Sequence, residues 1–404
     1  MSDAEFNLFE RASISIRCFS TACSEVMWDN GGMVDYLIIG AGLTGMLAAR
    51  ELAQTGASVA VVERGCVGQE SSWAGGGILS SLFPWRYPEA VSQLVVWSMA
   101  QQAKLAQELK ALSGIDPECL GSGLLMPAVA DVAQAKRWAQ QFDVVLEEVA
   151  DVAMLEPRLQ NGASGLWMPQ VGQVRNPRLL QALHAALLKL GVVFHSHSPV
   201  TELLVSDGRI EGVVTDRGVL RANIVVAASG AWSPRLLEGV GCPVDVEPVK
   251  GQMLLVKAES GWLSRIVLTD ACYLIPRLDG HILIGSTMEY AGFDKSTTEA
   301  ARHELYQAAI TLIPELASFP LIKQWAGLRP GSPQGVPFIG EHPDIQGLYV
   351  SAGHFRNGVA MGPASARLLA DLILARATIV DPKLYQISRN SDEDHHSAHV
   401  IELT

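Results

Sequence analysis

The stretch VDYLIIGAGLTGMLAARELAQTGASVAVVE, from Val34 to Glu63, decides the fold of this 404-residue chain. A short apolar run leads into a GxGxxG motif, a segment with helical spacing follows, and a second apolar run ends at an acidic residue. A GxGxxG motif alone is a weak signal, but these neighbours are those of a dinucleotide-binding βαβ unit. The sequence therefore predicts an α/β protein with a Rossmann-type domain.

Each part of the motif has a physical task. Gly40 permits the tight turn, Gly42 lets a pyrophosphate approach the backbone, and Gly45 lets the helix pack closely on the strand. The amino terminus of the helix attracts phosphate charge. Glu63 is expected to accept hydrogen bonds from ribose hydroxyls, and its charge disfavours a 2′-phosphate and hence NADP. Because NAD and FAD share the motif, these residues leave both open.

A second segment of small residues, SSWAGGGIL, follows shortly after the motif. It begins with the hydroxyls of Ser71 and Ser72 and continues through Gly75, Gly76 and Gly77. Such a segment lets backbone amides approach a flat ligand. We interpret it as a cofactor contact, with a flexible loop as the alternative.

Composition argues against several other classes of protein. A net charge of −12, from 42 acidic and 30 basic residues, argues against a face for nucleic acid. No apolar run reaches the ~18 residues of a transmembrane helix, so stable membrane insertion is not expected. The six cysteines include no CxxC pair, which favours a reducing cytosol and offers no metal spacing. We therefore predict a cytoplasmic protein without a metal site.

The chain is expected to fold as two discontinuous domains between non-structural ends. Residues 1–32 lack the apolar core of a secretory signal and precede Met33, so we interpret them as a dispensable or misassigned leader, with a targeting peptide as the alternative. Residues 388–404 are polar and are expected to be disordered. Helical spacing at 88–112 and 298–313, and β-rich patterning from 244 to 287, indicate insertions into the nucleotide-binding unit. The expected ranges are 33–85, 171–243 and 321–387 for the nucleotide-binding domain, and 86–170 and 244–320 for a substrate-binding domain.

Together these motifs resemble those of the D-amino-acid-oxidase-like flavoenzymes. The segments that carry the resemblance, besides the motif from Val34 to Glu63, are SSWAGGGIL, AASGAWS, VKGQMLLV, CYLIPR, IGSTME, WAGLRPGSP and GHFRNG. Within that family they are most similar to the glycine oxidases of thiamine biosynthesis, over residues 33–387. The resemblance implies FAD, a Rossmann-type FAD-binding domain, and an α+β substrate domain built on an antiparallel sheet. Because 325–363 contain no cysteine, the FAD is expected to be non-covalent.

The resemblance also implies an activity. Glycine, sarcosine or a small D-amino acid would be oxidised by hydride transfer to the flavin, giving an imine or glyoxylate, ammonia and, with O₂ as acceptor, H₂O₂. The family commonly forms dimers or tetramers, so a homo-oligomer is expected. Relatives often have His where this chain has Ala271, which weakens the expectation of a strict preference for glycine.

Site residues follow from the same resemblance. The expected FAD-binding residues are Gly40, Gly42, Leu43, Thr44, Gly45, Glu63, Arg64, Ser71, Ser72, Gly76, Gly77, Ile78, Val200, Gly230, His354, Phe355, Arg356, Asn357, Gly358, Val359 and Ala360. The expected catalytic residues on the substrate side are Arg329, Tyr273, Arg356 and Met288.

The chemistry expected of these residues is recognition of a carboxylate. A carboxylate buried in a partly apolar pocket is costly unless it is paired, and the planar guanidinium of Arg329 fits both its oxygens. The hydroxyl of Tyr273 can donate to the same group. The alternatives are a surface arginine in a proline turn, an ordinary strand tyrosine and, for Met288, a core filler. Arg356 is left open between substrate, flavin and its own loop.

Three other functions remain as alternatives at this point. The first is an FAD-dependent D-amino-acid dehydrogenase that uses an acceptor other than oxygen. The second is a relative that modifies transfer RNA, which the negative net charge disfavours. The third is a flavin-binding assembly subunit without turnover of its own.

Overall fold

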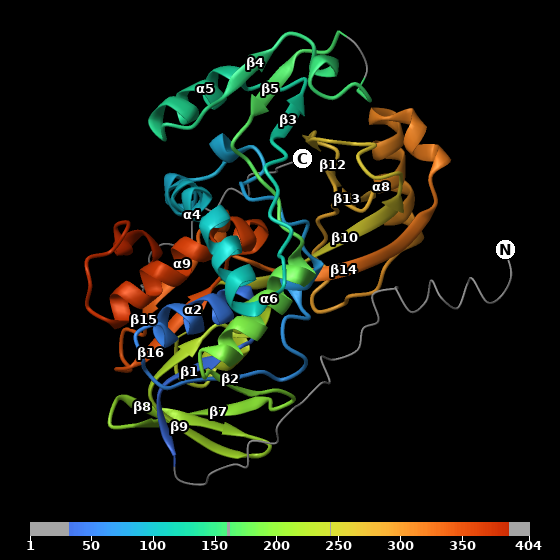
Figure 1. The fold of residues 1–404 in the computed structure, drawn as a ribbon. Coiled ribbons are helices and arrows are strands. Elements are labelled where there is room, and N and C mark those ends of the chain that lie inside the picture. Colours follow the sequence, from blue (N-terminus) through green and yellow to red (C-terminus); the bar gives the residue numbers. More distant parts are fainter. Residues whose placement is uncertain (1–31, 160–161, 243, 388–404) are drawn as a thin grey trace, which may run out of the picture.

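The computed structural model describes residues 32–159, 162–242 and 244–387. The expectations for residues 1–31 and 388–404 therefore lie outside the described residues. Within them the chain forms two sheets, each with its own helices (Figure 1).

The first sheet is built around the predicted βαβ unit. β1 (Met33–Ile39) leads through α2 (Leu43–Ala53) into β2 (Val59–Val62), which runs parallel to β1 with Ile39 opposite Val62. The strand order is β15-β16-β9-β1-β2-β6, and β7 and β8 form a hairpin attached to β9. The other bounds are β6 (Val193–His195), β7 (Val200–Ser206), β8 (Arg209–Thr215), β9 (Gly218–Ala227), β15 (Phe338–Glu341) and β16 (Leu348–Ala352).

Four helices pack together over one face of this sheet (Figure 1). They are α2, α4 (Glu89–Ser113), α6 (Asn176–Lys189) and α9 (Gly358–Ile373). Their apolar residues form one buried cluster. α4 contributes Val91, Leu94 and Val95 to it, and all three side chains are fully buried. The other face is covered in part by the hairpin and by α7 (Ser233–Glu238).

The second sheet has the order β14-β10-β13-β12-β11-β3-β5-β4 and is antiparallel except where β11 meets β3. Its helix α8 (Glu299–Leu312) begins after Thr298, whose side chain accepts a hydrogen bond from the Ala301 N–H, and it ends before Pro314. The bounds of the rest are β3 (Leu124–Pro127), α5 (Val132–Gln141), β4 (Glu147–Val149), β5 (Gly165–Met168), β10 (Glu247–Lys257), β11 (Ile266–Leu268), β12 (Tyr273–Pro276), β13 (His281–Gly285) and β14 (Leu321–Gly331).

Two segments belong to different cores from those expected. The eleven residues of β14 pair with β10 in the second sheet, so that sheet extends past the boundary expected at residue 321. α4, expected in the substrate-binding domain, buries its apolar side with α2, α6 and α9. In both cases long-range packing decides to which sheet or core the segment belongs, and the local sequence pattern of the segment does not specify this.

Within residues 32–159, 162–242 and 244–387, no helix is long and apolar enough to cross a membrane. No group of three or more His, Cys, Asp or Glu side chains that could hold a metal ion occurs among the described residues.

Candidate active site

A cavity of about 530 Å³ opens at the carboxyl ends of the parallel strands of the first sheet. It is lined by Ile39 at the end of β1, Val62 at the end of β2 and Ala228 directly after β9. In open α/β sheets, ligands bind outside the carboxyl ends of the strands. This is the place that the GxGxxG motif predicts for a dinucleotide.

The glycine loop is tightly packed against its surroundings. Gly40 has a φ of 108°, and a Cβ there would lie 2.5 Å from the carbonyl oxygen of Ala228. A Cβ at Gly45 would lie 2.1 Å from the carbonyl oxygen of Gly40, so α2 approaches β1 this closely only with glycine at that position. The amino end of α2 then faces the cavity, where its free N–H groups favour negative charge.

Glu63 fixes the glycine loop from the end of β2. Its carboxylate oxygens accept hydrogen bonds from the N–H groups of Ala41 and Gly65, both at 2.9 Å. Because each carboxylate oxygen has a second lone pair, Glu63 can still accept from a ligand hydroxyl, and it lines the cavity.

The serine-glycine segment is anchored from three sides. The hydroxyl of Ser72 in α3 (Ser71–Ala74) accepts from the N–H of Leu43 at 2.9 Å, and its carbonyl accepts from the Asn176 side chain at 2.8 Å. Farther along, Arg277, directly after β12, donates to the carbonyl of Gly76 at 2.7 Å. Arg277 is buried, and desolvation lowers its pKa to about 10. The segment is thus a fixed wall between the two sheets.

One rim of the large cavity is a stack of aromatic and cationic side chains. The Arg64 guanidinium lies 3.4 Å from the ring centre of Trp232, and the ring of Phe293 lies 5.2 Å beyond it. Arg235 follows at 4.1 Å from Phe293. Arg64, Trp232 and Arg235 line the cavity, whereas Phe293 comes from the loop after β13.

A buried histidine at the inner end of the cavity fits a bound cofactor. His354 is 3% exposed, and its Nε2 has no hydrogen-bond partner among the described residues. Burial lowers its pKa to about 4, so its ring is neutral at neutral pH. A buried nitrogen without a partner calls for a ligand atom. A single 3-10 turn, Phe355–Asn357, separates His354 from α9, so this nitrogen and the helix amino terminus together fit the polar groups of FAD.

Two small cavities, of about 80 and 90 Å³, adjoin this end and form the candidate substrate site. Tyr273, Ser286 and Arg356 line both of them, and Arg329 lines the first. Arg356 also lines the large cavity, so one cation borders all three spaces.

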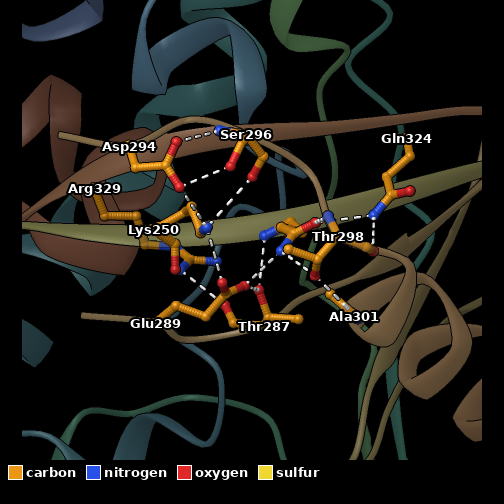
Figure 2. A network of polar contacts seen from close by, with 10 residues as sticks. Lys250, Thr287, Glu289, Asp294, Ser296, Thr298, Ala301, Gln324 and Arg329 are labelled. Atoms are coloured by element: carbon orange, nitrogen blue, oxygen red, sulfur yellow. Dashed lines mark hydrogen bonds and ion pairs between the residues drawn. The ribbon is translucent and has the colours of Figure 1, made fainter. Parts of the chain in front are cut away.

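Arg329 is held in one orientation by β10 and by the segment after β13. Its Nη2 donates to the Ser286 hydroxyl at 2.7 Å, and its Nη1 donates to the carbonyls of Thr287 at 3.1 Å and Lys250 at 3.4 Å. The guanidinium lies directly over Gly251, where a Cβ would be 2.1 Å from Nη2. This anchoring fixes the cation beside the first small cavity. Figure 2 shows Arg329 next to Lys250 and Thr287.

Burial lowers the pKa of Arg329 to about 10, with Tyr273 acting in the opposite direction and Arg356 lowering it further. The guanidinium is therefore still charged at neutral pH, but two cations lie close together in a poorly solvated place. A ligand carboxylate there would relieve the repulsion between them.

The predicted site residues fall into three groups. Those lining the large cavity are Gly40, Gly42, Leu43, Thr44, Glu63, Arg64, Ser71, Ser72, Val200, Gly230, Arg329, His354, Phe355, Arg356, Gly358 and Val359. Those lining one or both of the small cavities include Gly76, Gly77, Ile78, Tyr273, Arg329, Arg356 and, at the outer edge with 39% exposure, Met288. Three predicted residues do not line any of these three cavities: Gly45, Asn357 and Ala360.

Sequence reasoning missed the residues that hold the site in place. Ser286, Lys250 and Arg277 lie in the segments IGSTME, VKGQMLLV and CYLIPR, which were used for the resemblance without a role for these side chains. A lysine and an arginine inside apolar strand patterns were the available signal, because such residues are rarely buried without partners.

Comparison with known proteins agrees with this geometry. The family model described as FAD dependent oxidoreductase matches residues 35–372. Glycine oxidase from Pseudomonas aeruginosa is 45% identical over 353 residues, covering 86% of this chain and 97% of that protein. The bifunctional protein ThiO/ThiG from Synechocystis is 31% identical, covering 88% of this chain and 53% of that protein.

A solved structure is similar over its whole length. The crystal structure of glycine oxidase from Geobacillus kaustophilus has a TM-score of 0.85 and 29% identity, and the match covers 89% of this chain and 100% of that one. With the dinucleotide cavity, the family model and these relatives in agreement, the chain belongs to the family of FAD-dependent oxidoreductases that includes the glycine oxidases.

Proposed function

We propose that the protein catalyses the FAD-dependent oxidative deamination of glycine and other small amino acids, including sarcosine and small D-amino acids. The single observation that carries this proposal is the Arg329 guanidinium, anchored by three acceptors beside cavities of about 80 and 90 Å³. The products would be an imine or glyoxylate, ammonia and H₂O₂. The names of the relatives support a role in the formation of the thiazole of thiamine.

In this proposal Arg329 binds the substrate carboxylate through two parallel N–H···O bonds. Its three protein acceptors use only some of its five N–H groups, so donors remain for a ligand. Tyr273 is 8% exposed and directs its hydroxyl toward the Met253 sulfur at 3.7 Å, a weak acceptor that a carboxylate would replace. Together they would fix the orientation of the substrate α-carbon.

When bound, FAD supplies the hydride acceptor for oxidation of the amine carbon. The described residues around the small cavities provide no free carboxylate that could act as a general base at this carbon. Among the described residues that line the two small cavities, Asp270 is the one carboxylic acid, and Arg86 engages it at 2.6 Å. We therefore propose that the substrate amine binds in its neutral form, so that no side chain has to remove a proton from carbon.

The wall of the second small cavity supports a preference for glycine that still admits other small amino acids. Ala271 lines the second small cavity, and its short side chain leaves room beside Tyr273. A substrate with an N-methyl group or a short side chain would fit there. The proposal further includes a dissociable FAD and a dimer or tetramer in the cytoplasm.

The test is to measure H₂O₂ production under air from glycine, sarcosine, D-alanine and D-proline, together with the organic products. These are glyoxylate with ammonia from glycine, glyoxylate with methylamine from sarcosine, pyruvate with ammonia from D-alanine, and a cyclic imine from D-proline. We expect peroxide to appear in a 1:1 ratio with the oxidised organic product. If these substrates bleach the flavin but no peroxide forms, the result would favour a dehydrogenase that uses an acceptor other than O₂ over the proposed oxidase. The absence of bleaching with every amino acid would contradict the proposed function.

A further inference from the structure

The segment 286–298 joins β13 to α8 and is called the strap here. Its first residues supply two of the three acceptors of Arg329, the Ser286 hydroxyl and the Thr287 carbonyl. The position of the substrate-side cation therefore depends on where the strap lies. What fixes the strap is then part of carboxylate recognition.

The strap is fixed to β10 at Lys250. The Lys250 N–H donates to the Glu289 carbonyl at 2.8 Å, and the Glu289 N–H donates to the Lys250 carbonyl at 2.9 Å. That same Lys250 carbonyl is the third acceptor of Arg329. One peptide group thus touches both the strap and the guanidinium.

The side chain of Lys250 makes a second, ionic attachment. Its ammonium lies 3.0 Å from Glu289, 3.4 Å from Asp294 and 3.3 Å from the carbonyl of Ser296, as Figure 2 shows. The side chain is 3% exposed, and a lysine is rarely buried to that degree without paired charges. Burial by itself lowers the pKa of Lys250, but these two carboxylates more than offset the effect and raise it.

Glu289 carries the attachment back toward the start of the strap. Its carboxylate accepts from the Gln252 side chain at 2.8 Å and from the Thr287 hydroxyl at 2.5 Å. The Thr287 hydroxyl in turn accepts from the Gln252 N–H at 2.9 Å. The ammonium of Lys250, Glu289 and Thr287 therefore form a continuous chain of contacts that ends at a residue holding Arg329 (Figure 2).

We infer that Lys250 is a positioning residue for carboxylate recognition: through Glu289 and Asp294 it holds the strap so that Ser286 and Thr287 keep the Arg329 guanidinium in place. This inference rests on the proposed function, because it presumes that Arg329 binds the substrate carboxylate. Lys250 itself does not line any of the three cavities described above.

The experiment measures acetate binding to the FAD-loaded enzyme by the change in flavin absorbance, together with KM and kcat for glycine. Lys250→Met removes the ammonium and keeps the length of the side chain. We expect the Kd for acetate and the KM for glycine to rise about tenfold, because a cation misplaced by ~1 Å can cost up to ~100-fold. The kcat at saturating glycine should change much less.

Two controls separate positioning from stability. Lys257→Met removes a lysine at the far end of the same strand, where its ammonium donates to the backbone carbonyls of Ala258 and Asp279. Leu254→Ala opens a cavity in the core of β10 and lowers the melting temperature. Both should keep the wild-type Kd for acetate.

The outcomes are distinguishable. If Arg329→Ala abolishes acetate binding while Lys250→Met binds acetate like the wild type, the inference is overturned and the proposed carboxylate site stands. Wild-type acetate affinity in Arg329→Ala would overturn both. If Lys250→Met does not fold, Glu289→Gln takes its place: a several-fold rise in Kd supports the inference, and an unchanged Kd overturns it.

Discussion

Replacing Gly251 by alanine should disable the candidate carboxylate site without disturbing the fold. A Cβ at Gly251 would lie 2.1 Å from Nη2, 2.2 Å from Nη1 and 2.3 Å from Cζ of Arg329. Ordinary contacts need about 3.5 Å, so the guanidinium has to move by more than ~1 Å. The clash is with the far end of a flexible side chain, so the strand itself can keep its place.

We expect Gly251→Ala to lower catalytic activity and to leave stability nearly unchanged. Misplacement of a positioning group by ~1 Å can lower a rate about 100-fold, and we expect a loss of this order in kcat/KM for glycine, which is ~2.7 kcal/mol of transition-state stabilisation. The melting temperature and the FAD content should stay near those of the wild type. Both are measured on the same purified protein, alongside steady-state peroxide production.

The matched control is Gly340→Ala. Gly340 also lies in a strand, β15, and a Cβ there would meet nothing within 4 Å. This variant should keep wild-type kcat/KM. If Gly251→Ala kept wild-type kcat/KM and acetate affinity as well, then the guanidinium of Arg329 would not act from the position described, and the reasoning would be refuted.

Further predictions concern other parts of the site. Tyr273→Phe should raise the KM for glycine by about 10- to 150-fold with FAD retained, since a hydrogen bond to a charged group contributes ~1.5–3 kcal/mol; an unchanged KM would remove Tyr273 from the site. Phe293→Ala should speed the release of FAD, because the substitution removes the ring that packs on Trp232 at the rim of the large cavity. Release is followed by flavin fluorescence after dilution, and an unchanged rate would show that the stack does not retain the cofactor. Burial lowers the pKa of His354 from 6.5 to about 4, so the folded state binds fewer protons than the unfolded state between these values. The free energy of unfolding should therefore fall as the pH drops from 6.5 to 4, and His354→Gln should make this slope shallower in urea titrations.

The parts of the fold that the sequence predicts are those whose signals lie close together along the chain. The βαβ unit is one, because strand, glycine loop, helix and acid all lie within Val34–Glu63. The hairpin of β12 and β13 is another, because its turn stands between two alternating runs. Local signals also place the start of α8 after Thr298 and its end before Pro314.

The rest depends on contacts between distant segments. The membership of β14 in the second sheet is decided by its pairing with β10, and nothing within β14 specifies that partner. The same pairing puts Gly251 under the Arg329 side chain and so creates the room that this side chain occupies. The role of Lys250 requires residues from β10 and the strap together. A single sequence offers no rule that brings such segments into register.

The route of the chain between its two sheets limits how the enzyme can be re-engineered. The second sheet is assembled from two separate stretches, β3 to β5 and β10 to β14, and the helix α4 that precedes the first stretch is packed into the other core. A new substrate specificity therefore cannot be transplanted from a relative as one contiguous cassette. A chimaera needs two coordinated exchanges, roughly 124–168 and 247–331, and the second has to bring Gly251, the strap and Arg329 from the same parent.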